Sequence, residues 1–317
     1  MDNKKIMIIG GTGALGRTLI KRYHKENDIL VFSRDEHKHV KLKHKFPKVS
    51  YQIGDVKDKE SVLQALNEYK PDLVINTAAL KHVPICEDNP YESVKTNIIG
   101  HKNLIDCVYL SKHQIETLMF ISTDKACKPI NVYGMCKAIS ERLYIDFANK
   151  QKNIKVVLCR YGNVLESTGS VIPFFKTLLH KGANSLPITD ERMTRFSITL
   201  SESVDLIEWA YNHKESHGNI VVPKLKSLMV TDLAKELGKL YGYTDINLNY
   251  VGIRPGEKLH EEMISLEESL RTIDYGKYFM ISDNIINKET WSFTSDMDVL
   301  PSVEVKPFLK SKGVFND

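Results

Sequence analysis

The chain has 317 residues, of which 42% are apolar and 26% charged, and its net charge is +4. This composition is that of an ordinary globular protein, long enough for one large domain or for two lobes around a sizeable core. The lysines are scattered rather than blocked, which argues against nucleic acid as a partner, and no uncharged run reaches the roughly 20 apolar residues of a membrane span.

The cysteine pattern indicates a reducing compartment. The number of cysteines is odd and no two stand in a C-x-x-C spacing, which argues against a disulfide framework or a zinc site. Met1 leads directly into an expected strand and glycine loop, with no cleavable leader. We therefore expect a cytoplasmic protein with no membrane segment and with free thiols.

Short apolar runs alternate with amphipathic stretches through the first half of the chain. Helices are expected between the runs, for example over 59–69 and 92–112. Strand–helix alternation with a glycine loop after the first strand predicts an α/β fold, a doubly wound parallel (Rossmann) sheet with helices on both faces. The runs predict buried parallel strands at 5–10, 29–32, 49–54, 72–76, 117–122 and 155–160.

After Arg160 this rhythm changes. Loop signals crowd residues 161–200, helical patterns return at 201–213 and 230–241, and the end of the chain is expected to be irregular. We therefore predict a dinucleotide-binding domain over 1–160, with closing elements of the sheet from about 197–223. The remainder, 161–317, is expected to be mostly a smaller, interleaved substrate-binding lobe with an irregular C-terminal tail.

The stretch "GGTGALG" places Gly10, Gly13 and Gly16 between the first strand and the first helix. Glycines allow a tight turn and let backbone amides approach a pyrophosphate at the positive helix N-terminus. Glycine triplets also occur in plain turns. The strand–loop–helix context favours dinucleotide binding over that alternative.

The end of the second expected strand predicts which dinucleotide is bound. An acidic residue here favours NAD, but Ser33 and Arg34 precede any acid, and Lys38 follows one turn later. Arginine and lysine can pair with a 2′-phosphate, so we predict NADP; the alternative is that Asp35 binds the ribose of NAD. Asp55, after the third strand, is expected either to contact the adenine amine or to cap a helix.

Tyr133 and Lys137 stand four residues apart at the expected start of a helix, and therefore share one face. A lysine ammonium close to a phenol stabilises the phenolate and lowers the phenol's pKa from about 10. Such a phenolate can accept a hydroxyl proton while hydride leaves the same carbon for a nicotinamide. Following a strand and Ser-Thr-Asp, this pair predicts hydride-transfer chemistry.

With these residues in place the chain resembles an extended short-chain dehydrogenase/reductase, and within it the inverting UDP-N-acetylglucosamine 4,6-dehydratases (5-epimerising). The resemblance covers most of the chain to about residue 265 and fades beyond it. It rests on the segments "GGTGALG", "SRDE", "AALKHVP", "NPYESVKTN", "STDKACKPINVYGMCK", "RYGNV", "GSVIPFF", "PITDERMTRF" and "GIRPGEKLHE".

The resemblance implies a role for the pair Asp124–Lys125, which replaces the Asp–Glu pair of the retaining sugar-nucleotide dehydratases. Lys125 would take the C5 proton of a 4-keto sugar, and Asp124 would protonate the departing C6 hydroxyl, with Thr123 holding the C4 hydroxyl. These roles need a neutral amine and a protonated carboxyl near neutral pH. The alternative is a surface Asp–Lys pair that caps a loop.

The resemblance also implies the residues that contact cofactor and substrate, UDP-N-acetylglucosamine. NADP would be tightly bound, regenerated in each cycle, and contacted by Gly10, Thr12, Gly13, Ala14, Leu15, Gly16, Ser33, Arg34, Lys38, Asp55, Val56, Ala78, Ala79, Lys81, Tyr133 and Lys137. The substrate would be contacted by Lys81, Thr123, Asn163, Val171, Arg195, Arg254 and Glu257.

Four neighbouring residues receive other expectations. His82 is expected to be structural, Asn97 to position the catalytic helix through backbone bonds, and Cys127 and Cys136 to be small packing residues. A homo-oligomer is implied by the resemblance. Two other functions remain open: a UDP-sugar 4-epimerase or keto-reductase, which would not need Asp124–Lys125, and a non-catalytic NADP-binding sensor.

Overall fold

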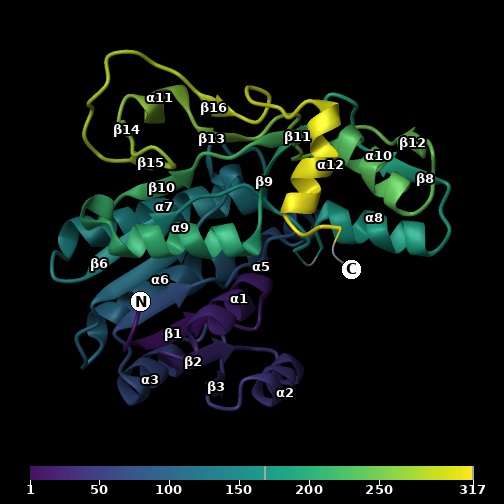
Figure 1. Cartoon of the computed structure of the whole chain (residues 1–317). Helices are drawn as coiled ribbons and strands as arrows, with labels where there is room; N and C mark the ends of the chain where they lie inside the picture. The colour runs from purple at the N-terminus through teal and green to yellow at the C-terminus, as the bar shows by residue number, and fades with distance from the viewer. Residues whose placement is uncertain (168, 316–317) are drawn as a thin grey trace.

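A central sheet of nine strands runs through the computed structural model, which describes residues 1–167 and 169–315 (Figure 1). The strand order is β14-β15-β10-β6-β5-β4-β1-β2-β3. All pairings from β3 to β10 are parallel, whereas β15 is antiparallel to both β10 and β14. The strands are β1 Lys5–Ile9, β2 Asp28–Ser33, β3 Ser50–Ile53, β4 Leu73–Asn76, β5 Thr117–Ile121, β6 Lys155–Cys159, β10 Ile220–Pro223, β14 Thr272–Asp274 and β15 Tyr278–Ile281.

Side chains that alternate along the strands supply a hydrophobic layer on each face of this sheet. In β1, Met7 and Ile9 belong to one layer and Ile6 and Ile8 to the other. The doubly wound α/β fold predicted from the alternation is thus confirmed. The first layer packs on α3 Lys59–Tyr69, α6 Gly100–Leu110 and α7 Val132–Lys150, and the second on α1 Ala14–Tyr23, α2 Glu36–Lys45 and α9 Leu200–Asn212.

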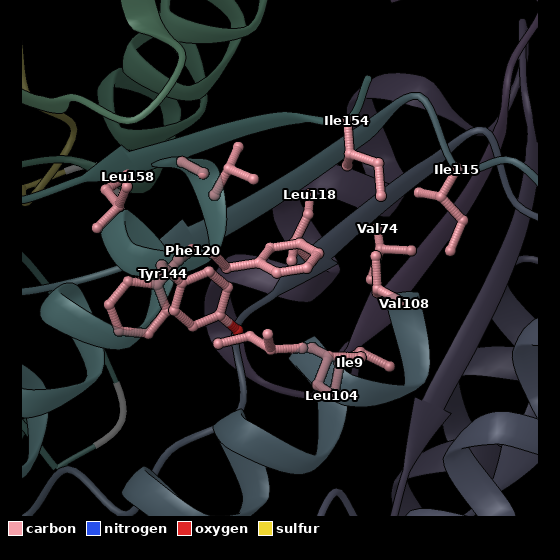
Figure 2. Close-up of a cluster of buried hydrophobic side chains, with 14 of the residues drawn as sticks. Ile9, Val74, Leu104, Val108, Ile115, Leu118, Phe120, Tyr144, Ile154 and Leu158 are labelled. Atoms are coloured by element: carbon pink, nitrogen blue, oxygen red, sulfur yellow. The ribbon is translucent and has the colours of Figure 1, made fainter. Parts of the chain in front are cut away.

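The first layer fixes helix α7 against the sheet, as Figure 2 shows. The ring of Phe120 on β5 stacks on the ring of Tyr144 on α7, with centroids 4.4 Å apart. The Tyr144 hydroxyl accepts a hydrogen bond of 2.8 Å from the side chain of Asn76 at the end of β4. Leu104 and Val108 of α6 close the same cluster. This packing holds α7 against the sheet.

A separate hydrophobic cluster is built entirely from residue 165 onward. Its helices and strands gather at the end of the molecule that lies away from β1, β2 and β3 (Figure 1). They are α8 Val171–His180, β8 Ser185–Ile188, α10 Val230–Leu240, β12 Asn247–Tyr250 and α12 Ser302–Ser311. Smaller elements join this part to the sheet: β7 Asn163–Val164, β9 Thr194–Ile198, β11 Ser227–Met229, β13 Glu262–Ile264, α11 Leu266–Ser269 and β16 Phe293–Thr294.

Two expectations about individual elements are wrong. The stretch 49–54 is not a buried strand, because β3 is the sheet's edge and its side chains are half-buried or exposed. The last 40 residues are not irregular throughout their described part, since β15, β16 and α12 lie there; residues 316–317 lie outside the described residues.

The expected helix 92–112 is confirmed as a continuous helical segment, which runs from α5 Pro90–Val94 through a π-helical turn, η1 Lys95–Ile99, into α6.

Candidate active site

A cavity of about 1120 Å³ opens at the carboxyl ends of the parallel strands, between the sheet and the segments that follow residue 160. This volume exceeds the roughly 300–1000 Å³ of a pocket for one drug-sized ligand. Every predicted site residue lines the cavity except Asp124, which is fully buried beneath its wall. The sequence therefore brings its cofactor, catalytic and substrate candidates to one place.

The glycine loop has the geometry of a phosphate cradle. Gly10 has a φ of 76°, and a Cβ there would lie 2.8 Å from the backbone of Ala78. A Cβ on Gly16 would lie 2.4 Å from the carbonyl oxygen of Gly11. Gly13 is the N-cap of α1, so the free amides of the first helical turn face the cavity. These contacts explain why the loop needs glycine, and they suit a bound pyrophosphate.

At the end of β2 the acidic residue already has partners. The Asp35 carboxylate caps α2 by accepting from the Lys38 amide at 3.0 Å, and it pairs with the Lys38 ammonium at 2.7 Å. Arg34 is half-exposed at the cavity and lies 3.6 Å from Asp55 Oδ2. Ser33 is buried and lies 2.6 Å from His39 Nε2. Arg34 and Lys38 therefore both bring a positive charge to the cavity, Arg34 beside Asp55 and Lys38 beside Asp35.

The helix-cap alternative for Asp55 is wrong. Asp58 caps α3, accepting a hydrogen bond of 3.1 Å from the amide of Ser61. Asp55 Oδ1 instead accepts from the Lys57 amide at 3.0 Å, which holds the turn after β3. Its carboxylate lines the cavity, where a nucleotide base could reach it.

The predicted catalytic tyrosine and lysine lie on the first turns of α7, as expected. Tyr133 is buried, and burial raises the pKa of its phenol to about 12, while the charge of Lys125 and a hydrogen bond with Thr123 act in the opposite direction. The Lys137 ammonium donates to the Ile121 carbonyl at 2.5 Å. Burial lowers the pKa of Lys137 to about 7, against the charge of Glu141. Lys125 is thus a cation that lowers the pKa of the phenol, and the expected effect of Lys137 on that pKa stays a prediction.

Lys125 lies in a short 3₁₀ turn, η2 Asp124–Ala126, and its ammonium meets three acceptors. They are Asp124 Oδ1 at 3.2 Å, Glu261 Oε1 at 3.0 Å and Asn163 Oδ1 at 3.3 Å. An ammonium has three N–H donors, so this arrangement suits the charged form. Although burial lowers the pKa of Lys125, the carboxylates of Asp124 and Glu261 together raise it. The neutral amine expected from the sequence is therefore not the resting state.

Asp124, in contrast to Lys125, favours its uncharged form. Burial raises the pKa of its carboxyl, and the negative charge of Glu261 adds to this, while Lys125 lowers it. Its Oδ1 accepts from Thr123 Oγ1 at 2.9 Å, and its Oδ2 has no hydrogen-bond partner among the described residues. The protonated carboxyl expected from the sequence agrees with this direction. Because Asp124 does not reach the cavity, its contact with a ligand runs through Thr123 or Lys125.

The turn that carries Lys125 packs directly on α7. A Cβ on Gly134 would lie 2.2 Å from the Lys125 carbonyl oxygen, so a side chain there would separate the turn from the helix. Asn131 caps α7 by accepting from the Gly134 amide at 2.7 Å and donates to the Gly256 carbonyl at 2.8 Å. The glycine and the asparagine therefore place the lysine of the turn and the tyrosine of the helix on one wall.

The predicted substrate residues line the same cavity. Arg195 on β9 donates to the backbone carbonyls of Thr194, Lys258 and Leu259 at 2.7–3.0 Å. It therefore clamps the segment that carries Glu257, whose Oε2 is buried with no partner among the described residues. Lys81 is an exposed loop residue, Val171 is the first residue of α8, and Arg254 is an exposed residue two positions before Gly256. The remaining two, Thr123 and Asn163, lie at the wall of Lys125.

The expectations for neighbouring residues have mixed outcomes. The Asn97 side chain bonds both backbone groups of Leu80, at 2.9 and 2.8 Å, so it holds the loop of Lys81 rather than α7; only its backbone carbonyl accepts from α7, through Ser140. His82 stands at the N-cap position of α4 Val83–Asp88, where its side chain makes no capping hydrogen bond within the described part of the chain, and it lines the cavity. All five cysteines are free and buried, Cys127 and Cys136 among them.

Glu261 was missed by the sequence reasoning. It is 2% exposed, lines the cavity and forms the shortest ion pair of Lys125. No local signal distinguishes it in "GEKLHE", because its partner lies more than a hundred residues earlier in the chain. A long-range ion pair of this kind becomes visible only once β13 has been placed beside the turn.

The fold and the Tyr133–Lys137 site define an extended short-chain dehydrogenase/reductase. Residues 6–283 match the family described as "Polysaccharide biosynthesis protein", and the chain belongs to this family. Among the described residues, no helix is both long and apolar enough to span a bilayer.

Individual relatives agree with the predicted family. The chain is 44% identical over 294 residues to a UDP-N-acetylglucosamine 4,6-dehydratase (inverting) of Campylobacter jejuni, covering 90% of this chain and 85% of the relative. It is 38% identical over 289 residues to a UDP-glucose 4-epimerase of Rickettsia felis, covering 88% and 83%. The predicted resemblance to the inverting dehydratases is confirmed.

A solved structure extends the likeness further along the chain. The X-ray structure of Pen from Bacillus thuringiensis matches with a TM-score of 0.90 and 28% identity, covering 99% of both chains. The likeness in fold therefore does not end near residue 265, where the sequence resemblance was expected to fade. The segments β14, β15 and α12 belong to the shared fold.

Proposed function

We propose that this chain is an NADP-dependent UDP-N-acetylglucosamine 4,6-dehydratase that inverts C5, giving UDP-2-acetamido-2,6-dideoxy-β-L-arabino-hex-4-ulose. The observation that carries the proposal is that Thr123 and Lys125 lie beside Tyr133 at one cavity wall, with Asp124 buried behind them and in contact with both. An enzyme that only oxidises and reduces a carbinol has no use for an acid and a base beyond the tyrosine, whereas elimination of water needs both. The name of the Campylobacter relative supports this substrate and outcome.

The residues present fit a nicotinamide dinucleotide. Gly10, Gly13 and Gly16 would hold its pyrophosphate at the start of α1, and Asp55 its adenine. The half-exposed guanidinium of Arg34 supports NADP over NAD, because Asp35 is already paired with Lys38. When bound, the nicotinamide supplies a hydride acceptor at C4 and returns the hydride at C6.

The chain's own residues would move the protons. Tyr133 accepts the C4 hydroxyl proton while Thr123 holds that hydroxyl; the charge of Lys125 favours the phenolate. Lys125, once it has released its proton to the solvent in the cavity, accepts the C5 proton that the C4 ketone makes acidic. The proton on Asp124 is relayed through the side chain of Thr123 or Lys125, because Asp124 does not itself reach the cavity, to the C6 hydroxyl, which leaves as water. A proton returned to C5 on the opposite face inverts that centre.

The substrate's diphosphate would lie along the wall after residue 160. Arg195 and Arg254 supply guanidinium groups that suit phosphate oxygens, Asn163 lies beside Lys125, and Glu257 has a free buried oxygen for a ribose hydroxyl. We accordingly propose the division into a cofactor domain over 1–160 and a mostly substrate-binding lobe over 161–317. The separate cluster built from residue 165 onward supports this division.

A homo-oligomer is proposed as well. Apolar side chains that are about half exposed gather on α4, α5 and α7, and association would remove them from water. Light scattering at several protein concentrations tests this directly, and a monomer at every concentration would contradict it. The side chains are those of Ile85, Tyr91, Met135 and Ile139.

The decisive experiment is an NMR assay of the purified chain with UDP-N-acetylglucosamine and a catalytic amount of NADP in deuterated water. Dehydration predicts a C6 methyl group and deuterium at C5, with the configuration at C5 inverted. Lys125→Ala is expected to abolish deuterium uptake at C5. Exchange at the wild-type rate in this variant would refute the role of Lys125 as the base.

The second candidate is a UDP-sugar 4-epimerase. The Rickettsia relative carries that name, and Thr123, Tyr133 and Lys137 would serve either reaction. In the same assay an epimerase gives a product inverted at C4 that keeps its C6 hydroxyl. Binding of NADP with no turnover of any UDP-sugar would instead indicate a non-catalytic sensor.

A further inference from the structure

The position of Glu261 raises a question about which carboxyl balances the charge of Lys125. Glu261 Oε1 lies 3.0 Å from Lys125 Nζ, closer than Asp124 Oδ1 at 3.2 Å. Both carboxyls are buried, and each keeps one oxygen with no hydrogen-bond partner among the described residues, Asp124 Oδ2 and Glu261 Oε2. Two buried carboxylates that share one ammonium would each keep part of their charge unbalanced in a site of low polarity, which is costly; Arg195 lies farther off, with its Nε 3.9 Å from Glu261 Oε1.

The backbone of Glu261 is fixed by a reciprocal pair of hydrogen bonds. Its amide donates to Ser295 Oγ at 2.9 Å, and its carbonyl accepts from the Ser295 amide at 2.8 Å. Ser295 itself is fully buried and bonds Thr194 Oγ1 at 2.7 Å. The carboxylate is therefore held at the cavity wall by the fold rather than by its own ion pair.

The surroundings of the two carboxyls differ in charge. Glu261 faces Lys125 and, at 3.9 Å, Arg195 Nε, with Lys258 also acting on it. Asp124 faces Lys125, the carboxyl of Glu261 and the phenol of Tyr133. Cations thus surround Glu261, whereas Asp124 shares one cation with a nearby carboxylate.

We propose that Glu261 is the counter-ion of Lys125 and a positioning residue for the elimination, and that its negative charge lets Asp124 remain protonated. The trio then contains one ammonium, one carboxylate and one carboxylic acid, and is neutral overall. This inference deepens the proposed function, on which the acid role of Asp124 rests. It explains how an aspartate next to a lysine can hold a proton to give. The pKa directions agree, because the pKa of Glu261 is lowered by Lys125 and Arg195 against burial, and that of Asp124 is raised by burial.

The test is an infrared titration that follows the carbonyl stretch of protonated carboxylic acids in the full chain. The wild type should show a protonated carboxyl near neutral pH, and Asp124→Asn should remove it. In Glu261→Gln the loss of a neighbouring negative charge should move the midpoint of this band down by about 1–3 pH units. Glu261→Asp keeps the negative charge, so the midpoint in this variant should lie close to that of the wild type.

The control is Glu262→Gln, which removes a carboxylate from the adjacent residue. Glu262 pairs with the exposed Lys128 at 3.2 Å, and its loss should leave the midpoint in place. An unchanged midpoint in folded Glu261→Gln, or a wild-type band that survives Asp124→Asn, would overturn the inference. If Glu261→Gln does not fold, Glu261→Asp provides the test. Because this variant keeps the negative charge, a fall in its midpoint as large as that expected for loss of the charge would also overturn the inference.

The titration needs no sugar, so its result can refute the counter-ion assignment without bearing on the proposed function. A chain that forms no C6 methyl group yet shows the expected midpoints would refute the dehydratase and leave the counter-ion assignment standing. In an active enzyme, Glu261→Gln should also shift the pH profile of C5 deuterium exchange. A merely structural role would lower the rate at every pH by the same factor.

Discussion

Replacing Lys137 with methionine should make the protein's stability less dependent on pH. Lys137 is 2% exposed, and burial lowers its pKa from 10.5 to about 7, with the charge of Glu141 acting the other way. The unfolded chain keeps this proton up to about pH 10.5. Between the two values the unfolded state binds one proton more than the folded state, so the free energy of unfolding rises with pH in that window.

The size of the effect follows from one proton. Each pH unit contributes about 1.4 kcal/mol, so the wild type should gain about 2–3 kcal/mol between about pH 7 and pH 9 from Lys137 alone. Lys137→Met removes this contribution, because methionine fills a similar volume and does not titrate. The variant should therefore be most favoured over the wild type near pH 7, where burying the amine costs most, and should lose that advantage toward pH 9.

Urea unfolding followed by the fluorescence of Trp209 and Trp291 measures this difference at several pH values. Lys150→Met, at the exposed end of the same helix, is the matched control and should show no such trend; its ammonium pairs with Asp146 at 2.7 Å on the surface. If the difference in free energy of unfolding between the wild type and Lys137→Met stays constant from about pH 7 to pH 9, the reasoning is refuted. The variant should also lose activity, since Lys137 lines the cavity beside Tyr133.

Three further substitutions test other parts of the site. Gly16→Ala should lower the stability by about 1–3 kcal/mol in thermal unfolding, because the added Cβ would lie 2.4 Å from the Gly11 carbonyl oxygen. In the control Gly13→Ala the added Cβ would lie 3.3 Å from its nearest atom, so the loss should be smaller. Equal losses in the two variants would contradict the packing argument. Arg34→Ala should reduce the preference for NADP over NAD by about tenfold or more in nucleotide titrations, and a wild type that prefers NAD would exclude the 2′-phosphate contact. Arg160→Met should cost about 3–5 kcal/mol, because Glu141 and Glu268 would each lose a buried partner within 2.6–2.9 Å; an unchanged melting temperature would show that the pair contributes nothing.

The first half of the fold could be predicted because its strands are continuous apolar runs. A strand such as Thr117–Ile121, buried along its whole length, needs apolar residues at every position, and that pattern is visible locally. The same is true of the glycine loop, whose residues are required by contacts within one strand–turn–helix unit. Residues that are required by contacts with their neighbours in the chain can therefore be recognised from the local sequence.

The parts that were missed depend on contacts between distant segments. The strand β14 is only Thr272–Asp274, too short for a periodic signal, and it exists because β15 pairs with it at the sheet's edge. Lys125 was expected to be neutral because its role as the base requires a neutral amine, and only Asp124 was known to be near it. The second carboxylate, Glu261, favours the charged amine instead. Glu261 directly precedes β13, and the pairing of β13 with Phe293–Thr294 helps to place it near Lys125.

The π-helical turn between α5 and α6 makes the length of this segment as important as its composition. The turn holds one residue more than an α-helix would, and Asn97 within it reaches back to Leu80. Deleting one residue here would restore a regular helix and rotate everything after it by about 100° relative to α5. Leu104 and Ile105 would then turn away from the sheet. Exchange of exposed side chains should therefore be tolerated along this helix, whereas loss of a single residue should not.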